Sequence, residues 1–272
     1  MTLKEELKSL REYKIHRSEE RISRLLEPML RHIGSPDPEL RDGLIYSTFA
    51  KWAKDDCLTD EQLQFLLTTC VGESHLFYHI GKCGDDSVFT RSFSALVIAA
   101  IMQKDRERRA LPAEVVKETL EKTLLYLARE KDVRGFVKGK GWAHSIAHGA
   151  DLLTSVTLHP SVSMECHEDI LQAVQDCLFK KVTYVDDEDE RLTFVIEALL
   201  DKRIAAAQLE QWIGKTSEKL EEYLREEGHS LDFYRTKTNV VNFFKTVYFR
   251  INLRQVRKQI EERVEYWHRT LY

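Results

Sequence analysis

The spacing of apolar residues restricts this chain to helices almost from end to end. Nearly every segment carries apolar side chains at positions i, i+3, i+4 and i+7, the period that places them on one side of an α-helix. The 272 residues include only 5 prolines and 11 glycines, and the alternating pattern of a half-buried strand is scarce. The sequence therefore predicts an all-α protein.

Breaks in this periodicity divide the chain into eleven or twelve predicted helices. Thr59 and Gln62 form a capping box at the start of one of them, because each side chain can bond the other residue's backbone N–H. A break near Asn239 or Asn252 would divide the last segment. The predicted segments are residues 3–12, 17–33, 39–54, 59–71, 88–103, 112–131, 141–158, 163–179, 186–202, 205–227 and 231–269.

An acidic residue followed by an arginine recurs where helices begin. Arg41, Arg91, Arg134 and Arg191 are spaced by 50, 43 and 57 residues, and helix pairs that recur every 40 to 50 residues are typical of HEAT and armadillo repeats. We therefore expect an irregular α-solenoid in a single domain over residues 1–272, with residues 231–272 as C-terminal capping helices. In such an array the acidic residue–arginine pairs would link neighbouring helix pairs. The second helix of each pair would line a concave side, and these helices would fall in Gly43–Ala50, Ser87–Gln103 and Gly141–Met164.

Charge and hydropathy exclude several classes of partner. The net charge is −4 with the two signs interspersed, whereas nucleic-acid-binding proteins carry a basic patch or stripe. No apolar run reaches the roughly 18 residues that span a bilayer, and the first ten residues do not resemble a signal peptide. Five widely spaced cysteines without a CxxC motif fit reduced thiols. We expect a cytoplasmic protein that binds neither nucleic acid nor membrane.

The stretch Gly141–Met164 is unusually poor in charge. It contains one charged residue, Asp151, although 32% of the whole chain is charged. If the stretch forms a helix from Gly141 onward, one side of it carries two imidazoles, a carboxylate and a hydroxyl instead of the lysines and glutamates of a solvated face. Such a side indicates the lining of an enclosed polar cleft. Its residues are His144, His148, Asp151 and Ser155.

The two histidines permit a metal hypothesis. His144 and His148 have the i, i+4 spacing that lets two imidazoles bind one metal ion, such as zinc, from one helix face. Asp151 would lie about 10.5 Å from His144 along a straight helix axis, so it would join only if the helix bent at Gly149, or it would orient an imidazole from outside the metal shell. A hydrogen-bonded polar cluster is the favoured alternative, because no HExxH motif is present.

Arg91 is the second unusual charge. It is the only charged residue from Ser87 to Gln103, and a buried guanidinium must be paired. The favoured interpretation is a link to Asp86 or Asp42. The functional alternative is an anchor for a carboxylate or phosphate, whose oxygens suit the two-pronged guanidinium. The predicted ligand-binding residues are accordingly Arg91, Asp86, Asp42, Arg134 and Trp142.

Three blocks of the sequence resemble a known family. SPDPELRDGLIYSTFAKW, LFYHIGKCGDDSVFTRSFSALVIAAI and EKDVRGFVKGKGWAHSIAHGADLL are similar to the bacterial domain-of-unknown-function family 2785, found in Bacillus-like bacteria. The resemblance covers roughly residues 1–230 and implies a helical, HEAT-like single domain in the cytoplasm, without an agreed activity. The matching motif positions are Asp42, Asp86, Ser87, Arg91, Arg134, Trp142, His144, His148 and Asp151.

These observations leave three functional hypotheses. The first is a protein that binds a small polar or anionic ligand in a pocket of His144, His148, Asp151 and Arg91. The second is a metal-dependent hydrolase, in which His144 and His148 hold a metal-activated water or act as general base and Asp151 assists. The third is a protein-interaction scaffold, the common use of solenoids. Whether a reaction is catalysed stays open, as does the oligomeric state.

Overall fold

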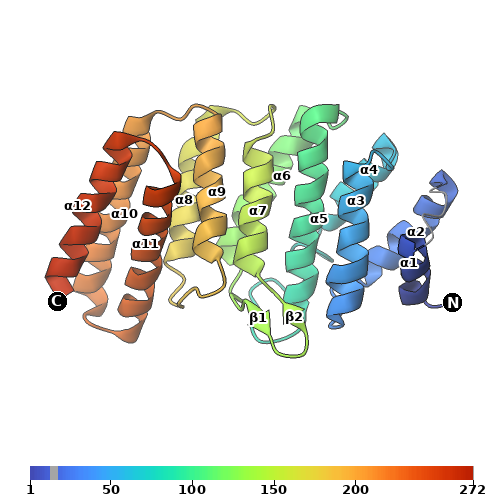
Figure 1. Ribbon diagram of the computed structural model, residues 1–272, viewed down its shortest axis with the longest axis horizontal. Helices are drawn as coiled ribbons and strands as arrows, with labels where there is room; N and C mark the ends of the chain where they lie inside the picture. The colour runs from blue at the N-terminus through green and yellow to red at the C-terminus, as the bar shows by residue number, and fades with distance from the viewer. Residues whose placement is uncertain (13–17, 272) are drawn as a thin grey trace. The chain divides into compact units, whose positions relative to one another are not determined.

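The computed structural model describes residues 1–12 and 18–271 and is almost entirely helical (Figure 1). The all-α prediction is confirmed: in the described residues the only strands are two strands of two residues each, which form one hairpin. The α-helices are α1 (Leu3–Glu12), α2 (Glu19–Arg31), α3 (Ser47–Lys54), α4 (Asp60–Cys70), α5 (Ser87–Arg108), α6 (Ala113–Arg129), α7 (Ser145–Thr157), α8 (His167–Leu178), α9 (Glu188–Asp201), α10 (Ala206–Glu227), α11 (Leu231–Arg250) and α12 (Arg254–Leu271). The others are the π-helix η1 (Glu39–Tyr46), the 3₁₀-helix η2 (Met164–Cys166) and the strands β1 (Phe136–Val137) and β2 (Gly141–Trp142).

Local sequence signals located several helix ends correctly. The Thr59 side chain accepts a bond from the Gln62 backbone N–H, and Gln62 accepts one in return from Thr59, so the predicted capping box opens α4. A break lies between α11 and α12 at Asn252, as expected. The predicted helix 17–33 is observed as α2, and Arg17 lies outside the described residues.

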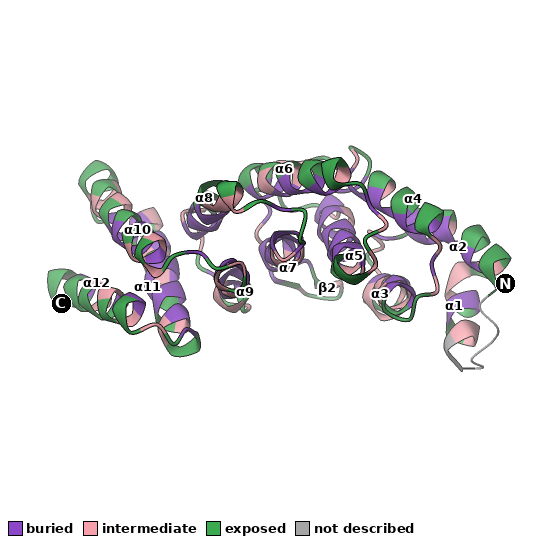
Figure 2. Cartoon of the chain, turned by 90° about the horizontal axis from the view of Figure 1, so that it is seen from above, coloured by how far each residue is buried: buried purple, intermediate pink, exposed green. Residues whose placement is uncertain are grey.

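The chain forms two compact units, Met1–Val162 (unit 1) and Ser163–Tyr272 (unit 2). In unit 1, α2, α4 and α6 form one layer and α3, α5 and α7 form a second (Figure 2). Helix α5 is the centre of this unit, because it packs against α3, α4 and α7. In unit 2, α10 packs against α11 and α12, and α9 packs against α11. The expected single domain over residues 1–272 stays a prediction.

The predicted helix 39–54 is divided into the π-helix η1 and α3. Its residue Arg41 is fully buried, and its guanidinium lies 4.1 Å from the ring centre of Phe89 and 4.7 Å from that of Phe93. Arg41 donates to the backbone carbonyls of Ser35 (2.6 Å) and Lys140 (2.6 Å). Burial lowers the pKa of Arg41 to about 10. The arginine thereby links η1 to the loop that carries the hairpin.

The prediction of a helix starting at Gly141 is wrong. Residues 136–142 form an antiparallel hairpin, and α7 begins only at Ser145. Gly139 and Gly141 adopt φ values of +78° and +77°, which a glycine adopts without strain and which a helix does not contain. Trp142 therefore lies in β2, and His144 precedes α7 with a left-handed φ of 47°.

Helix α7 approaches α6 closely at Gly149. A Cβ atom at this position would lie 2.6 Å from Leu127 Cδ2 and 3.0 Å from Tyr126 Cε1. Gly149 thus allows α7 and α6 to pack closely. Nothing in the described residues shows that the helix bends at Gly149, as the sequence suggested.

A buried polar pair links the end of α5 to the end of α7. His159 Nε2 lies 3.1 Å from Asp105 Oδ2, and both side chains are at most 1% exposed. Since His159 Nδ1 accepts a bond from the Ser161 backbone N–H (3.2 Å), the imidazole proton lies on Nε2 and is donated to Asp105. Asp105 Oδ1 also accepts from the Ala110 and Leu111 backbone N–H groups. The pair therefore holds a neutral histidine.

This pair makes stability depend on pH. Burial lowers the pKa of His159 below its ordinary value, and burial does the same for His75. Below about pH 6.5 the unfolded chain takes up protons that the folded chain does not, so stability falls by up to about 1.4 kcal/mol per pH unit for each histidine. Urea unfolding between about pH 7.5 and about pH 5.5 should show this slope, and His159→Gln should reduce it. An equal slope in the variant would contradict the assignment.

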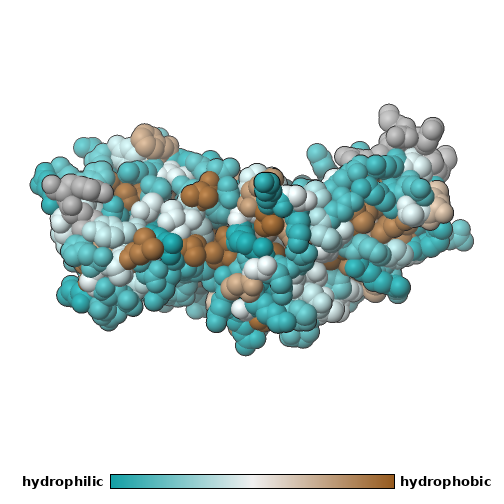
Figure 3. All heavy atoms as spheres, turned by 90° about the horizontal axis from the view of Figure 1, so that it is seen from below, coloured by the Kyte–Doolittle hydropathy of each residue, from teal (hydrophilic) through white to brown (hydrophobic). Residues whose placement is uncertain are grey.

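Within the described residues, no helix combines the length and the apolar character needed to cross a bilayer. On the face drawn in Figure 3, hydrophobic residues form separate areas within a largely hydrophilic surface. The larger exposed apolar side chains include Phe136, Trp142, Val185, Leu231 and Phe249.

Candidate functional site

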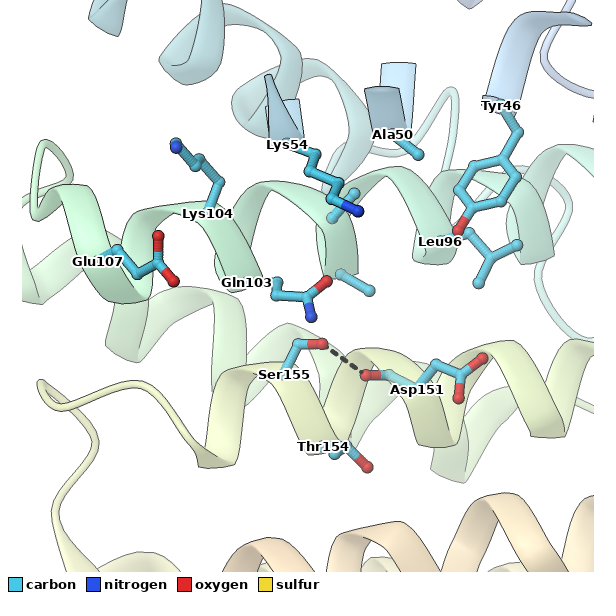
Figure 4. A pocket seen from close by; sticks show the side chains of 12 residues that line it. Tyr46, Ala50, Lys54, Leu96, Gln103, Lys104, Glu107, Asp151, Thr154 and Ser155 are labelled. Atoms are coloured by element: carbon cyan, nitrogen blue, oxygen red, sulfur yellow. Dashed lines mark hydrogen bonds between the residues drawn. The ribbon is translucent and has the colours of Figure 1, made fainter. Parts of the chain in front are cut away.

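Three helices of the same layer of unit 1 enclose a groove. A cavity of about 560 Å³ lies between α3, α5 and α7 (Figure 4). Its apolar part consists of Ala50 from α3 and of Leu96, Ala99 and Ala100 from α5. The three alanines have short side chains, and the cavity has room for a ligand of small-molecule size, since such sites usually occupy about 300–1,000 Å³.

Polar side chains surround this apolar floor on both sides. Lys54 extends from α3 toward the middle of the groove, and the Gln103 carboxamide of α5 lies near it (Figure 4). Asp151 and Ser155 line the α7 side, where the Ser155 hydroxyl donates to the Asp151 backbone carbonyl at 2.9 Å. Tyr46, the last residue of η1, closes one end.

The two lysines that line the groove differ in whether they form an ion pair. Lys104 forms a 2.7 Å ion pair with Asp56 and is 12% exposed. Lys54 is exposed and makes no ion pair with any residue that the structure describes. A ligand can therefore recruit the Lys54 ammonium without breaking an existing pair, whereas recruiting Lys104 would compete with Asp56.

The predicted histidines lie beside this groove and do not line it. The Trp142 ring stacks on His144 with 4.3 Å between ring centres, and the His144 and His148 rings are 5.7 Å apart. His148 contacts Phe93 edge to face at 5.2 Å, and Phe93 contacts Tyr46 at 6.1 Å. The five rings form a continuous row of contacts from the hairpin to the end of the groove, and all but the Trp142–His144 contact are edge to face.

The metal hypothesis finds limited support in this geometry. His144 and His148 are neighbours as predicted, although His144 reaches this place from the turn before α7 and not from the helix itself. Within the described part of unit 1, the two histidines and Asp151 do not come together as a three-residue metal-binding group. Asp151 lines the groove instead.

Arg91 is buried in unit 1, and all its N–H groups form hydrogen bonds there. Its Nε donates to Glu130 Oε2 at 2.5 Å and its Nη2 to Glu130 Oε1 at 2.9 Å, and both residues are fully buried. Nη1 donates to Ser87 Oγ (2.7 Å) and to the Tyr78 carbonyl (3.0 Å), and Nη2 also donates to the Lys82 carbonyl (3.2 Å). No donor is left for a ligand, so the structure does not bring Arg91 into a pocket with the histidines.

The predicted pairing of Arg91 with Asp86 or Asp42 is also wrong. Asp86 pairs instead with Lys140 at 2.6 Å. Glu130 follows α6 directly, and its ion pair with Arg91 joins the end of α6 to the start of α5. The recurrence of acidic residues and arginines at helix starts pointed to Asp86 and Asp42, and Glu130, at the end of a helix, is not part of that recurrence.

The remaining predicted ligand-binding residues lie outside the groove. Arg134 forms a two-pronged pair with Asp132 (2.8 and 2.6 Å) and donates to the Asp85 carbonyl, which links two neighbouring loops. Hydrogen bonding to Asp132 raises the pKa of Arg134. Asp42 is half-buried within η1. Neither these residues nor Trp142 line the groove.

Lys54, Gln103 and Tyr46 are groove residues that sequence reasoning missed. Lys54 lies at the end of α3 and Gln103 in the second half of α5, so 49 positions of the chain separate them. One signal was present: Gln103 follows the charge-poor part of α5, whose alanines form the floor. Lys54 has no comparable signal, because a lysine at a helix end is commonly a solvated residue.

Comparison with known proteins identifies one relationship. A family model described as "Protein of unknown function (DUF2785)" matches residues 76–249. The match includes α5 and α7, which form two walls of the groove, whereas α3 lies before it. The searches of curated proteins and of solved structures find no match.

Proposed function

The chain belongs to the family described as "Protein of unknown function (DUF2785)", and we propose that it binds a small polar, anionic ligand in the groove between α3, α5 and α7. The observation that carries the proposal is the Lys54 ammonium, which extends into a groove with an apolar floor and has no ion pair among the described residues. An ammonium in this position can form charge-assisted hydrogen bonds with an anionic group.

The two sides of the groove orient such a ligand. The anionic group belongs near Lys54 and Gln103, because both offer N–H donors. The opposite wall carries the Asp151 carboxylate, which repels an anion but accepts bonds from hydroxyl or amine groups. The four apolar side chains of the floor suit a short hydrocarbon or planar segment between the two ends. A small acid with a hydroxyl or amine substituent satisfies all three requirements.

An irregular HEAT-like array in one cytoplasmic domain remains part of this proposal. The two helix layers of unit 1 support it. Arg91 and Arg134 also support it, because each joins the α4–α5 pair to the segment that follows α6. A metal-dependent hydrolase has weaker support, because the rings of His144 and His148 lie in the row of aromatic contacts beside the groove. No specific observation favours a protein-interaction scaffold over ligand binding.

Replacing Lys54 by methionine tests the proposed ligand site. Small mono- and dicarboxylates and phosphate esters would first be screened by thermal shift, and hits measured by calorimetry. We expect a ligand whose dissociation constant rises by about ten- to a hundredfold in Lys54→Met, since a hydrogen bond to a charged group contributes about 1.5–3 kcal/mol. The melting temperature without ligand should not change, because Lys54 is exposed.

Lys51→Met is the matched control. Lys51 lies on the same helix, is exposed and does not line the groove, and its contact with Asp55 is a 3.7 Å surface pair. Its replacement should leave ligand affinity unchanged. A panel without any ligand, or equal affinities in the two variants, would refute the proposal.

A further inference from the structure

Unit 2 contains an apolar groove of its own, between α11 and α12. The cavity measures about 570 Å³, and Tyr248, Ile260 and Val264 form its apolar surface. Phe249 stands at its edge and is 78% exposed, an unusual position for a large aromatic side chain. Since α10 packs against both helices from the other side, the groove is an open face of this three-helix group (Figure 2).

The two sides of this groove carry opposite charges. Lys245 lines it from α11, and it makes no ion pair with any described residue. Glu261 and Glu265 line it from α12. Glu261 accepts a bond from the Tyr248 hydroxyl (2.7 Å), and Glu265 has a 2.7 Å surface pair with Arg269. Of the groups that line the groove, the ammonium thus comes from α11 and both carboxylates come from α12, which also contributes His268.

We propose that this groove binds a second copy of the same chain through a two-fold axis. A two-fold interface must match itself, so each feature of the surface needs its complement on that same surface. Here the exposed Phe249 ring of one copy can enter the apolar groove of the other copy, and the reverse contact forms at the same time. A two-fold rotation can also place Lys245 of one copy opposite Glu261 and Glu265 of the other. An unrelated partner would require neither match.

The dimensions of the face indicate a reversible dimer. Helices α11 and α12 contain 20 and 18 residues, so at 1.5 Å per residue they are about 30 and 27 Å long. With helix axes about 8–10 Å apart, the paired face covers roughly 500–600 Å² on each copy. That area lies below the 800 Å² per partner of a standard interface but reaches the total of about 1,000 Å² that specific contacts need. The dimer should therefore dissociate on dilution.

Sedimentation of the full chain over two orders of magnitude in concentration tests the proposal. The wild type should shift from monomer to dimer. Phe249→Glu should raise the dimer dissociation constant by at least about tenfold, because it places a charge in the apolar contact. Val185→Glu is the matched control: Val185 is 80% exposed in the segment between α8 and α9, so it lies on neither helix of the groove. It should dimerise as the wild type does.

Charge reversal provides the second arm. Lys245→Glu and Glu265→Lys should each weaken the dimer, and the combined variant should recover it, because the opposite charges again face each other across the axis. Circular dichroism would verify that all variants keep their helix content. A wild type that stays monomeric throughout, equal effects of Phe249→Glu and Val185→Glu, or no recovery in the combined variant would overturn the proposal.

Discussion

Glu130→Gln should lower the free energy of unfolding of unit 1 by about 3–5 kcal/mol, the range found when one partner of a buried ion pair is removed. Glu130 is the only carboxylate bonded to Arg91 in the described structure, and both side chains are fully buried. Glutamine keeps an oxygen but removes the negative charge, so the guanidinium would remain charged in the interior. Since whole domains are stable by only about 5–15 kcal/mol, the variant should be close to unfolding.

Urea unfolding, followed by circular dichroism, measures this loss. Glu27→Gln is the control, because Glu27 pairs with Arg31 on the surface, where both side chains are more than 60% exposed. Its removal should change stability by less than about 0.5 kcal/mol. If Glu130→Gln does not fold, the double variant Arg91→Met with Glu130→Met should restore folding, because both charges of this pair are then removed from the interior. A Glu130→Gln protein as stable as the control would contradict the role of the pair.

Arg41→Met should detach the hairpin from η1 and destabilise unit 1 by about 2–4 kcal/mol, from lost bonds to carbonyls and lost cation–π contacts. The guanidinium donates to the carbonyls of Lys140 and Trp142 and lies against Phe89 and Phe93. Methionine can fill part of this space but donates no hydrogen bond. The carbonyls would lose their protein partner, and the hairpin would lose its link to η1.

Hydrogen exchange distinguishes this local effect from general destabilisation. In Arg41→Met, amide exchange should accelerate more for residues 136–142 than for α4, because Arg41 bonds the hairpin loop and makes no such bond to α4. Lys51→Met again serves as a control for the removal of a positive charge. Uniform acceleration across unit 1, without a larger change in the hairpin, would show that Arg41 contributes only to the core.

The periodicity of the sequence predicted the helices because it reports a local property. A helix that buries one face must repeat its apolar residues every three or four positions, so α2, α4 and α8 appear nearly where expected. The hairpin was missed for the same reason. The pattern predicts that a helix starts within Gly141 to Ser145. In the structure, Gly139 and Gly141 adopt positive φ values, and the backbone around them forms two short strands.

The candidate site shows the limits of spacing more clearly. Asp151 and Ser155 were correctly placed on one side of α7, and both line the groove. The prediction combined them with Arg91 because both helices were poor in charge. In the structure, Arg91 lies near the start of α5 and turns to Glu130, while Leu96 to Gln103, farther along the same helix, face the groove.

The amino-acid sequence by itself determined the all-α architecture, most helix boundaries, the family membership and the importance of the charge-poor segments, since each follows from residues adjacent along the chain. Only the tertiary structure decided which acid neutralises Arg91, which rings the histidines contact, and that Lys54, Gln103 and Asp151 line the same groove. These contacts join residues up to about a hundred positions apart. Their partners are selected by how helices pack and which polar groups become buried together, and local spacing carries no information about either.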